Sequence, residues 1–210
     1  VFDWAWADAY ERAGLRYYPK LLMASPFSPI PGARLLASNA DSQSALIAAV
    51  SEQVTHAGLS SAHVLFADST EIVALEKAGW LIRENVQFHW INRSYQRFDD
   101  YLAALTQPKR KKIKAERRKV RDAGVATELK AGSAITESDW AFFYRCYERT
   151  YLEHRSTPYL SLAFFLQIAA QMPDVFVMCI AKRNGQSIAS SLLMQSDGVL
   201  YGRYWGALER

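Results

Sequence analysis

The spacing of hydrophobic and polar positions divides this 210-residue chain into helical and strand segments. In the first half, apolar residues recur at helical or at alternating spacing. The pattern predicts, in chain order, a helix over 1–15, a strand over 17–24, a helix over 42–56, a strand over 62–67, a helix over 68–75 and a strand over 80–91. Residues 25–32 carry three prolines and must form a shaped loop. This order of elements is typical of an α/β layer.

The second half combines helices and strands in a different order. The pattern predicts helices over 98–105, 108–123, 136–151 and 161–170 and strands over 125–129, 175–181, 187–195 and 199–205. Asn184-Gly185 and Asp197-Gly198 separate the last three strands, and such pairs favour the tight turns of β-hairpins. We therefore expect an antiparallel meander here. For the chain as a whole we predict an α/β (α+β) fold of two halves, neither complete, with mixed sheets flanked by helices.

Short polar residues at the predicted helix starts indicate where the helices begin. Such residues accept hydrogen bonds from the first backbone N–H groups of a helix. A Glu or Asp three positions later can close a capping box. The expected caps are Asp41 or Ser42 for the second helix, and the pairs Asp68–Glu71 and Thr136–Asp139 for two later ones.

Composition narrows the class of protein. Half of the residues are apolar and 13% are aromatic, which is enough for a substantial core. No apolar run approaches the roughly 20 residues of a membrane-spanning helix. Cys146 and Cys179 form no metal-binding pattern, and three histidines are scattered, so we expect no metal. Two reduced cysteines in a core are typical of a cytoplasmic protein.

The positive charge of the chain is concentrated in one segment. Residues 109–121, KRKKIKAERRKVR, hold nine of the 25 basic side chains and a single acid. The other residues carry 16 basic and 20 acidic side chains, so the formal net charge of +4 comes from this segment alone. Pro108 suits a helix start and Gly124 a helix end. Attraction for anions is therefore expected at one helix.

Two interpretations of this basic helix remain open. It can be a solvated surface face, because Lys and Arg stems cover apolar surface while their charges reach water. It can also dock phosphates from a nucleotide, CoA, tRNA or a lipid-linked precursor, assisted by the helix dipole near Lys109 and Arg110. The spacing of Arg110, Lys114 and Arg117 places these three side chains along one face.

The strand predicted over 80–91 carries the one histidine in a suggestive setting. Alternation would place Gln87 and His89 on one face, opposite Val86, Phe88 and Trp90. A general base needs a suitable pKa and reach to the proton that it removes. No partner carboxylate or nucleophile can be named from spacing, and a hydrogen-bonded structural histidine is the competing interpretation.

The last predicted strand is the second place where chemistry is expected. Tyr201 and Arg203 alternate with Gly202 and Tyr204, so Tyr201 and Arg203 would share a face of the sheet. Arg203 is a candidate substrate contact. It can equally be an ion-pair arginine that packs in the core.

Several blocks of the chain together resemble a bacterial family of peptidoglycan biosynthesis or recognition proteins, which is similar to Fem-type aminoacyltransferases. The blocks are VFDWAWADAYERAGLRYYPKLL, PFSPIPGARLL, QFHWINRSYQRFDDYL, KRKKIKAERRKV and LYGRYWGA. The resemblance implies two acetyltransferase-like (GNAT-like) domains. Residues 1–95 would be the later part of the first domain and residues 96–210 the earlier part of the second, so that the chain would be a central fragment.

The resemblance also implies where ligands would lie. The loop after the first strand occupies the position of the turn that holds the pyrophosphate of acyl-CoA in acetyltransferase-like folds. Gly32 is its only glycine and its three prolines offer no N–H, which favours an ordinary structural loop with Arg34 as the possible phosphate contact. The basic helix matches one that Fem-type proteins carry at the start of the second domain, with Lys109, Arg110, Lys111, Lys114 and Arg117 as the residues that match.

Three hypotheses of function follow. The first is an acyltransferase or aminoacyltransferase that acts on a cell-wall precursor or a related amine, with acyl-CoA or aminoacyl-tRNA as donor and with His89 or Arg203 as candidates for the chemistry. The second is a recognition module that binds a glycan or a phosphate-bearing precursor without turnover. The third is an RNA-binding protein that uses the basic helix, although aromatic residues do not interleave with its charges.

Overall fold

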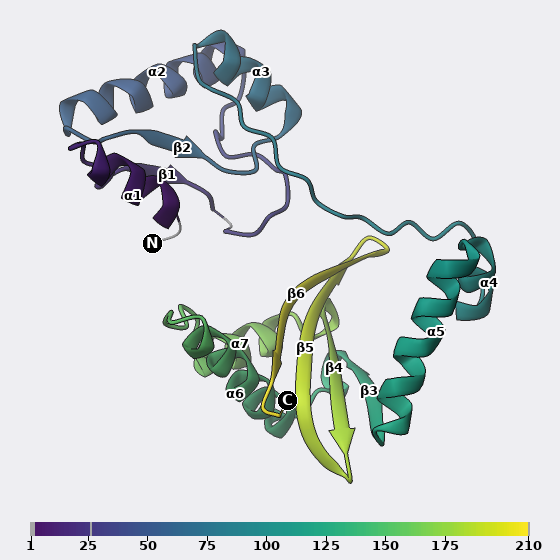
Figure 1. Ribbon diagram of the computed structural model, residues 1–210. Helices are drawn as coiled ribbons and strands as arrows, with labels where there is room; N and C mark the ends of the chain where they lie inside the picture. The colour runs from purple at the N-terminus through teal and green to yellow at the C-terminus, as the bar shows by residue number, and fades with distance from the viewer. Residues whose placement is uncertain (1–2, 26, 210) are drawn as a thin grey trace. The chain divides into compact units, whose positions relative to one another are not determined.

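The computed structural model describes residues 3–25 and 27–209. The chain divides into two compact units, Val1–Trp90 and Ile91–Arg210, each of which is described by itself (Figure 1). Each unit combines helices with a sheet, which confirms the predicted mixed α/β fold class. The assignment of residues 1–95 and 96–210 to two acetyltransferase-like domains stays a prediction.

In its described residues, the first unit holds three helices and a small parallel sheet. Its elements are α1 (Trp4–Arg12), β1 (Leu21–Met23), α2 (Ala40–His56), β2 (Ala62–Val64) and α3 (Ser69–Lys77). Strands β1 and β2 are parallel, and Leu21 pairs with Ala62. An isolated parallel bridge between Gly32 and Ala67 continues this pairing beyond the strands. Both strands are shorter than predicted, and Pro19, which has no N–H for a ladder, precedes β1.

The buried apolar cluster of the first unit is small. Leu35, Ile47 and Leu75 are its buried members, and α2 and α3 supply the last two of them. The residues that pack against this cluster are only half-buried, and they are Met23, Val64, Ala67, Ala74 and Trp80. The loop 25–36 therefore reaches the core through Leu35.

In the first unit one predicted cap differs from the structure, and one predicted capping box is only half formed. Helix α2 begins after Asn39, whose side chain accepts a hydrogen bond of 2.8 Å from the backbone N–H of Ser42, so the prediction of Asp41 or Ser42 as the cap was wrong. Asp68 caps α3 as expected, because it accepts from Thr70 and Glu71 N–H groups at 2.9 Å. The Glu71 carboxylate, however, turns to the loop 25–36 instead of closing a capping box.

The strand predicted over 80–91 does not form. Among the described residues none pairs with this segment, and Val86 and Phe88 are 84% and 95% exposed. The alternation itself is present, because His89 Nε2 lies 3.1 Å from Gln87 Oε1. An alternating pattern predicts an extended backbone, whereas a strand also requires a neighbour that supplies the ladder hydrogen bonds.

The second unit is built around a four-stranded antiparallel sheet. Its elements are α4 (Phe98–Ala104), α5 (Gln107–Asp122), β3 (Val125–Ala131), η1 (Gly132–Ala134), α6 (Glu137–Glu153), α7 (Leu162–Gln171), η2 (Pro173–Val175), β4 (Phe176–Arg183), β5 (Gln186–Ser196) and β6 (Val199–Ala207). The strand order is β3-β4-β5-β6, with α6 packed on β5 and β6, and with α5 in contact with β3 (Figure 1). The predicted meander is thus confirmed. Its two hairpin turns have positive φ at both central residues, as at Asn184 (52°) and Gly185 (78°).

The core of the second unit lies between its sheet and α6 and α7. Eleven buried residues of the described part form one cluster, and the aromatic face predicted for α6 contributes Trp140, Phe143 and Tyr147. Phe165 of α7 meets Phe143 edge to face, with ring centroids 5.2 Å apart. Helix α6 lies so close to β6 that a Cβ at Gly206 would overlap the carbonyl group of Cys146. This close packing fixes β6 against the helix.

Candidate functional site

The basic segment forms helix α5, which is exposed on nearly all sides. Its 16 residues make it about 24 Å long at 1.5 Å per residue. Pro108 lies in its first turn, and Gly124 follows its end with a φ of 70°. No residue of α5 is buried, and only Arg110, Ile113 and Ala115 are half-buried. The basic side chains therefore do not contribute to a core.

Most of the positive charges on α5 have no acidic partner among the residues that the structure describes. Two of its nine basic residues form ion pairs, Lys112 with Glu116 at 3.9 Å and Arg121 with Asp122 at 3.6 Å. Within the described part of the chain, the other seven have no carboxylate within 4.0 Å, and these are Lys109, Arg110, Lys111, Lys114, Arg117, Arg118 and Lys119. Unpaired like charges repel one another, so an anion that binds here relieves that repulsion.

The structure divides the predicted stripe of Arg110, Lys114 and Arg117. The guanidinium of Arg117 lies over the Phe98 ring of α4, 4.2 Å from its centroid, and Arg110 is half-buried. Lys114 is exposed. Helical spacing aligns it with Lys111 and Arg118, which are also exposed, so this stripe is the open basic face of α5. The sequence analysis did not select Arg118. Spacing alone could not show that Arg117 packs on Phe98 and that Arg118 takes its place in the open stripe.

Arg34 holds the loop after β1 in place. Its Nε donates to the carbonyl of Leu65 at 2.9 Å and its Nη2 to the carbonyl of Ile30 at 2.9 Å, while Nη1 donates to Ala33 at 3.2 Å. The same side chain lines a groove of about 530 Å³ together with Phe27 and residues 22–25. The guanidinium of Arg34, the possible phosphate contact, thus binds backbone oxygens at the edge of a groove, as a structural loop residue would.

Glu71 anchors the same loop and was missed as a site residue. Its Oε1 accepts hydrogen bonds from the backbone N–H groups of Arg34 at 2.7 Å and Leu35 at 2.6 Å. The residue is 2% exposed, and its Oε2 is buried without a hydrogen-bond partner among the described residues. A buried carboxylate binds backbone N–H groups more strongly than a neutral acceptor does. Glu71 and Arg34 together fix the path of the loop.

Gln87 and His89 lie together near that loop, although not in a sheet. Gln87 Nε2 donates to the carbonyl of Pro29 at 2.8 Å, and its Oε1 lies 3.1 Å from His89 Nε2. Both side chains are exposed. The geometry therefore brings the two predicted residues to one place beside the loop, and their role stays a prediction.

A β-bulge changes the predicted arrangement of Tyr201 and Arg203. Leu192 of β5 pairs with Tyr204, and Leu193 pairs with Gly202, so Arg203 is the extra residue. Beyond the bulge, Tyr201 pairs with Met194. Opposed residues share a face, and Leu192 and Met194 both pack toward the core. Tyr201 and Tyr204 therefore lie on the helix side of the sheet, which strict alternation does not predict.

Arg203 is held by two tyrosines. Its Nη2 donates to the Tyr159 hydroxyl at 2.8 Å, and its guanidinium lies 4.6 Å from the centroid of the Tyr204 ring. The hydroxyl oxygens of Tyr159 and Tyr204 are 3.0 Å apart. Arg203 and Tyr204, adjacent in the sequence, thus converge on one residue of the loop between α6 and α7.

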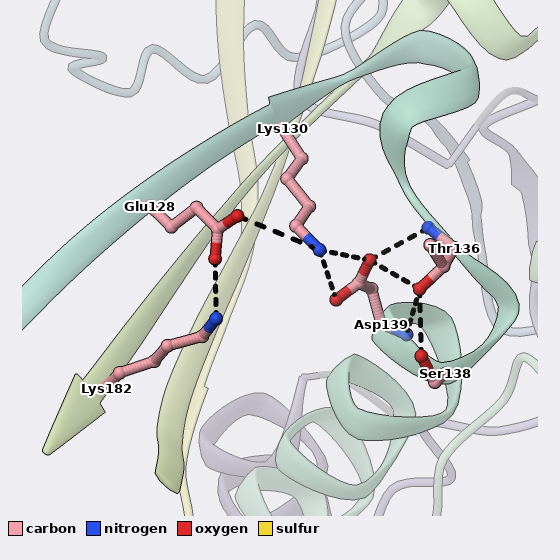
Figure 2. Close-up of polar contacts among 6 residues, drawn as sticks. All are labelled: Glu128, Lys130, Thr136, Ser138, Asp139 and Lys182. Carbon is pink, nitrogen blue, oxygen red and sulfur yellow. Dashed lines mark hydrogen bonds and ion pairs between the residues drawn. The ribbon is translucent and has the colours of Figure 1, made fainter. Parts of the chain in front are cut away.

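A chain of polar side chains joins β3 and β4 to the start of α6 (Figure 2). Lys182 Nζ lies 2.6 Å from Glu128, and Lys130 Nζ binds both carboxylate oxygens of Asp139 at 2.9 and 2.8 Å. Asp139 also accepts from the backbone N–H and the hydroxyl of Thr136, completing the predicted capping box. Burial acts to raise the pKa of Asp139, but the hydrogen bonds from Lys130 and Thr136 outweigh it and lower the pKa. Each carboxylate is paired, so this network is structural.

The cysteines and the remaining acidic groups show no reactive arrangement in the described residues. Burial raises the pKa of the Cys146 thiol to about 11, so it stays protonated at neutral pH. No group of three or more His, Cys, Asp or Glu in the described residues could hold a metal ion. Within the same residues, no helix has the length and the apolar character needed to cross a membrane.

Comparison with known proteins identifies a family over the whole length of the chain. The model of the FemAB-like family, described as peptidoglycan biosynthesis/recognition, matches residues 1–210. No curated protein matches the chain. The family match spans the loop held by Arg34 and Glu71, helix α5 and the bulged strand β6.

Proposed function

The chain belongs to the FemAB-like family of peptidoglycan biosynthesis/recognition proteins, and from this premise we propose that it is an acyltransferase or aminoacyltransferase. Its acceptor is the amine of a cell-wall precursor or a related amine. The observation that carries this proposal is the open basic face of α5, Lys111, Lys114 and Arg118, on a helix with seven basic side chains unpaired among the described residues. These charges dock the phosphates of a substrate.

Two features favour aminoacyl-tRNA over acyl-CoA as the donor. Helix α5 spreads its charges over about 24 Å, which matches a row of phosphates better than one pyrophosphate does. The loop at the expected CoA position offers few backbone N–H groups, and the Arg34 guanidinium binds three carbonyl oxygens. Both donors are made inside cells, so we place the reaction in the cytoplasm.

The proposed reaction is a direct transfer. The amine nitrogen of the acceptor attacks the carbonyl carbon of the acyl donor, and a C–N bond forms as the bond to the carrier oxygen or sulfur breaks. The amine loses one proton, and the leaving group takes up one proton. His89, exposed beside Gln87, is the candidate to accept the proton, and Arg203 is a candidate substrate contact.

The test is a binding titration of the chain with tRNA and with acetyl-CoA, followed by tryptophan fluorescence. We expect saturable tRNA binding that weakens steeply with salt, because each phosphate contact releases a counterion. Charge reversal of the open face (Lys111→Glu, Lys114→Glu, Arg118→Glu) should weaken binding at least tenfold. Reversal of three exposed basic residues elsewhere (Arg16→Glu, Lys77→Glu, Arg155→Glu) has the same effect on net charge and serves as the control.

The results separate this proposal from its rivals. Equal losses in both triple variants would show a response to net charge and would contradict a docking role for α5. Aminoacyl transfer from charged tRNA to an amine acceptor would establish the enzyme. Binding of tRNA without transfer would favour an RNA-binding protein. Binding of a cell-wall precursor alone, without transfer, would favour a recognition module.

A further inference from the structure

The four-stranded sheet of the second unit packs against α6 and α7 on one face and, among the described residues, is open on the other. The packed face carries Met178, Ile180 and Leu192, which are fully buried in the core. Side chains alternate between the two faces of a strand, so the residues next to these lie on the face away from the helices. On that outer face Leu129 of β3 is 71% exposed and Trp205 of β6 is 67% exposed. Both edges of the outer face are therefore accessible.

The strand registers place three rows of four residues across the outer face. The middle row consists of Leu129, Cys179, Ser191 and Trp205. The two flanking rows are Ala131, Val177, Leu193 and Gly202 on one side and Thr127, Ala181, Ala189 and Ala207 on the other. None of the residues in the three rows is charged.

Charge enters this face at one end, as a neutralised pair. Arg183 lies opposite Val125, beyond the row of Thr127, and its guanidinium forms an ion pair with Glu209. In a symmetric dimer the same patch of both copies meets, so like charges on the patch would face each other and repel. A face without unpaired charge avoids this repulsion. It is therefore electrostatically compatible with a second copy of itself.

The relief of the outer face also suits a second copy. In the middle row the large side chains, Leu129 and Trp205, lie on the edge strands, whereas in one flanking row the large side chains, Val177 and Leu193, lie on the central strands. Bulky positions in one row thus lie beside small ones in the next. An identical face turned by a two-fold rotation can set its ridges against these hollows, as in sheets that pack face to face.

The outer face is large enough for a small dimer interface. Four strands at a spacing of roughly 4.8 Å give a width of about 19 Å. Strands of 7 to 11 residues are roughly 24–37 Å long. Two copies would thus cover roughly 900–1,400 Å² in total, and a specific interface needs about 1,000 Å².

We propose that the outer face, centred on the row from Leu129 to Trp205, is the interface of a symmetric homodimer. Its occupant is the outer face of a second copy of this chain. Burial of Leu129 and Trp205 supplies the driving force, and no unpaired charge has to be desolvated. The proposal is separate from the proposed transferase activity, because it uses none of the residues assigned to that activity.

The test is sedimentation velocity of the whole chain over a wide range of protein concentration. We expect monomers at low concentration and dimers at high concentration. Cys179 gives a second measurement, because it lies in the middle row, while the buried thiol of Cys146 has its pKa raised to about 11 and reacts slowly. Labelling of Cys179 by a thiol reagent should slow as the dimer forms.

Two variants and a control decide whether the outer face is the interface. Leu129→Lys and Trp205→Lys place a charge at exposed positions of the edge strands, so the fold is retained. Each charge would be buried in the dimer without a partner, which should weaken the dimer roughly tenfold or more. Leu152→Lys, at a 62% exposed position of α6, is the matched control and should dimerise like the parent chain.

Three results would overturn the proposal. The first is a parent chain that stays monomeric at every concentration. The second is a Leu129→Lys variant that dimerises as well as the parent chain, which would place the interface elsewhere. The third is an equal loss of dimer in Leu152→Lys, which would show a response to added charge instead of a specific interface.

Discussion

The two units differ in how much apolar surface each one buries. The first unit is built on a two-stranded sheet, and in its described residues it buries an apolar cluster of three residues, Leu35, Ile47 and Leu75. The second unit is built on a four-stranded sheet, and in its described residues it buries an apolar cluster of eleven residues. A wide sheet with helices on one face gives large side chains a common interior, whereas a sheet of two short strands does not.

Polar contacts have a correspondingly larger part in the first unit. The Lys20 side chain is 4% exposed, and its ammonium is hydrogen-bonded to Asp3 and, at 2.8 Å, to Tyr17, which joins the start of α1 to the segment before β1. Glu71 and Arg34 fix the loop 25–36. The comparison teaches that the first unit depends on a few specific contacts, while the second depends on collective packing.

The largest effect is expected from a cavity in the core of the second unit. Phe165 is fully buried and contacts five aromatic rings in or against the cluster and a sixth on its own helix. Phe165→Ala should destabilise this unit by about 4 kcal/mol, measured by urea-dependent hydrogen exchange of β4 and β5 amides. Its neighbour Phe164 is 39% exposed, so Phe164→Ala is the matched control with a smaller loss. Equal losses of stability in Phe165→Ala and Phe164→Ala would contradict the conclusion that the second unit depends on its buried aromatic cluster.

A smaller effect, confined to the first unit, is expected from Glu71→Gln. The variant keeps the shape of the side chain but removes the negative charge of the carboxylate that accepts hydrogen bonds from the backbone N–H groups of Arg34 and Leu35. This loss should lower the free energy of unfolding of the first unit by about 2 kcal/mol. Faster hydrogen exchange of these two amides is the direct measurement. Glu76→Gln, at an exposed position of α3, is the control. Unchanged exchange in Glu71→Gln would show that the loop does not depend on this carboxylate.

The smallest effect is the pH dependence of the network in Figure 2. The pKa of Asp139 is lowered from its ordinary value of 3.8, because the hydrogen bonds from Lys130 and Thr136 outweigh the effect of burial. A lowered pKa means that the contribution of Asp139 to stability is complete above about pH 4 and is lost as the pH falls through the folded-state value. Thermal unfolding between pH 7 and pH 2 should show this loss, and Asp139→Asn should reduce it. If Asp139→Asn lost as much thermal stability between pH 7 and pH 2 as the parent chain, Asp139 would not be the source of this pH dependence.

The helices and hairpins were accessible from the sequence because their signals are local. The capping box of Thr136 and Asp139, the aromatic face of α6 and the turns at Asn184 and Asp197 each depend on residues a few positions apart. The concentration of charge in α5 is likewise a property of consecutive residues. Such features need no knowledge of distant contacts.

The features that the sequence did not reveal depend on distant partners. Residues 80–91 alternate like a strand, but whether a strand forms is decided by a neighbour that the sequence does not specify. Glu71 carries the spacing of a capping box, yet its carboxylate binds a loop 36 and 37 residues away along the chain. Arg34 lies in a loop that was expected to be structural, with a phosphate as a possible contact, and the sequence could not show that its guanidinium binds the carbonyl of Leu65.

The sequence by itself therefore determined the fold class, most helices, the meander and the basic helix, because short-range periodicity and capping decide them. Only the tertiary structure decided which side chains of α5 are open, how Glu71 and Arg34 fix their loop, and where Arg203 lies. That last position depends on a one-residue change of register between β5 and β6, and such a shift moves side chains between the faces of a sheet without any local sequence signal.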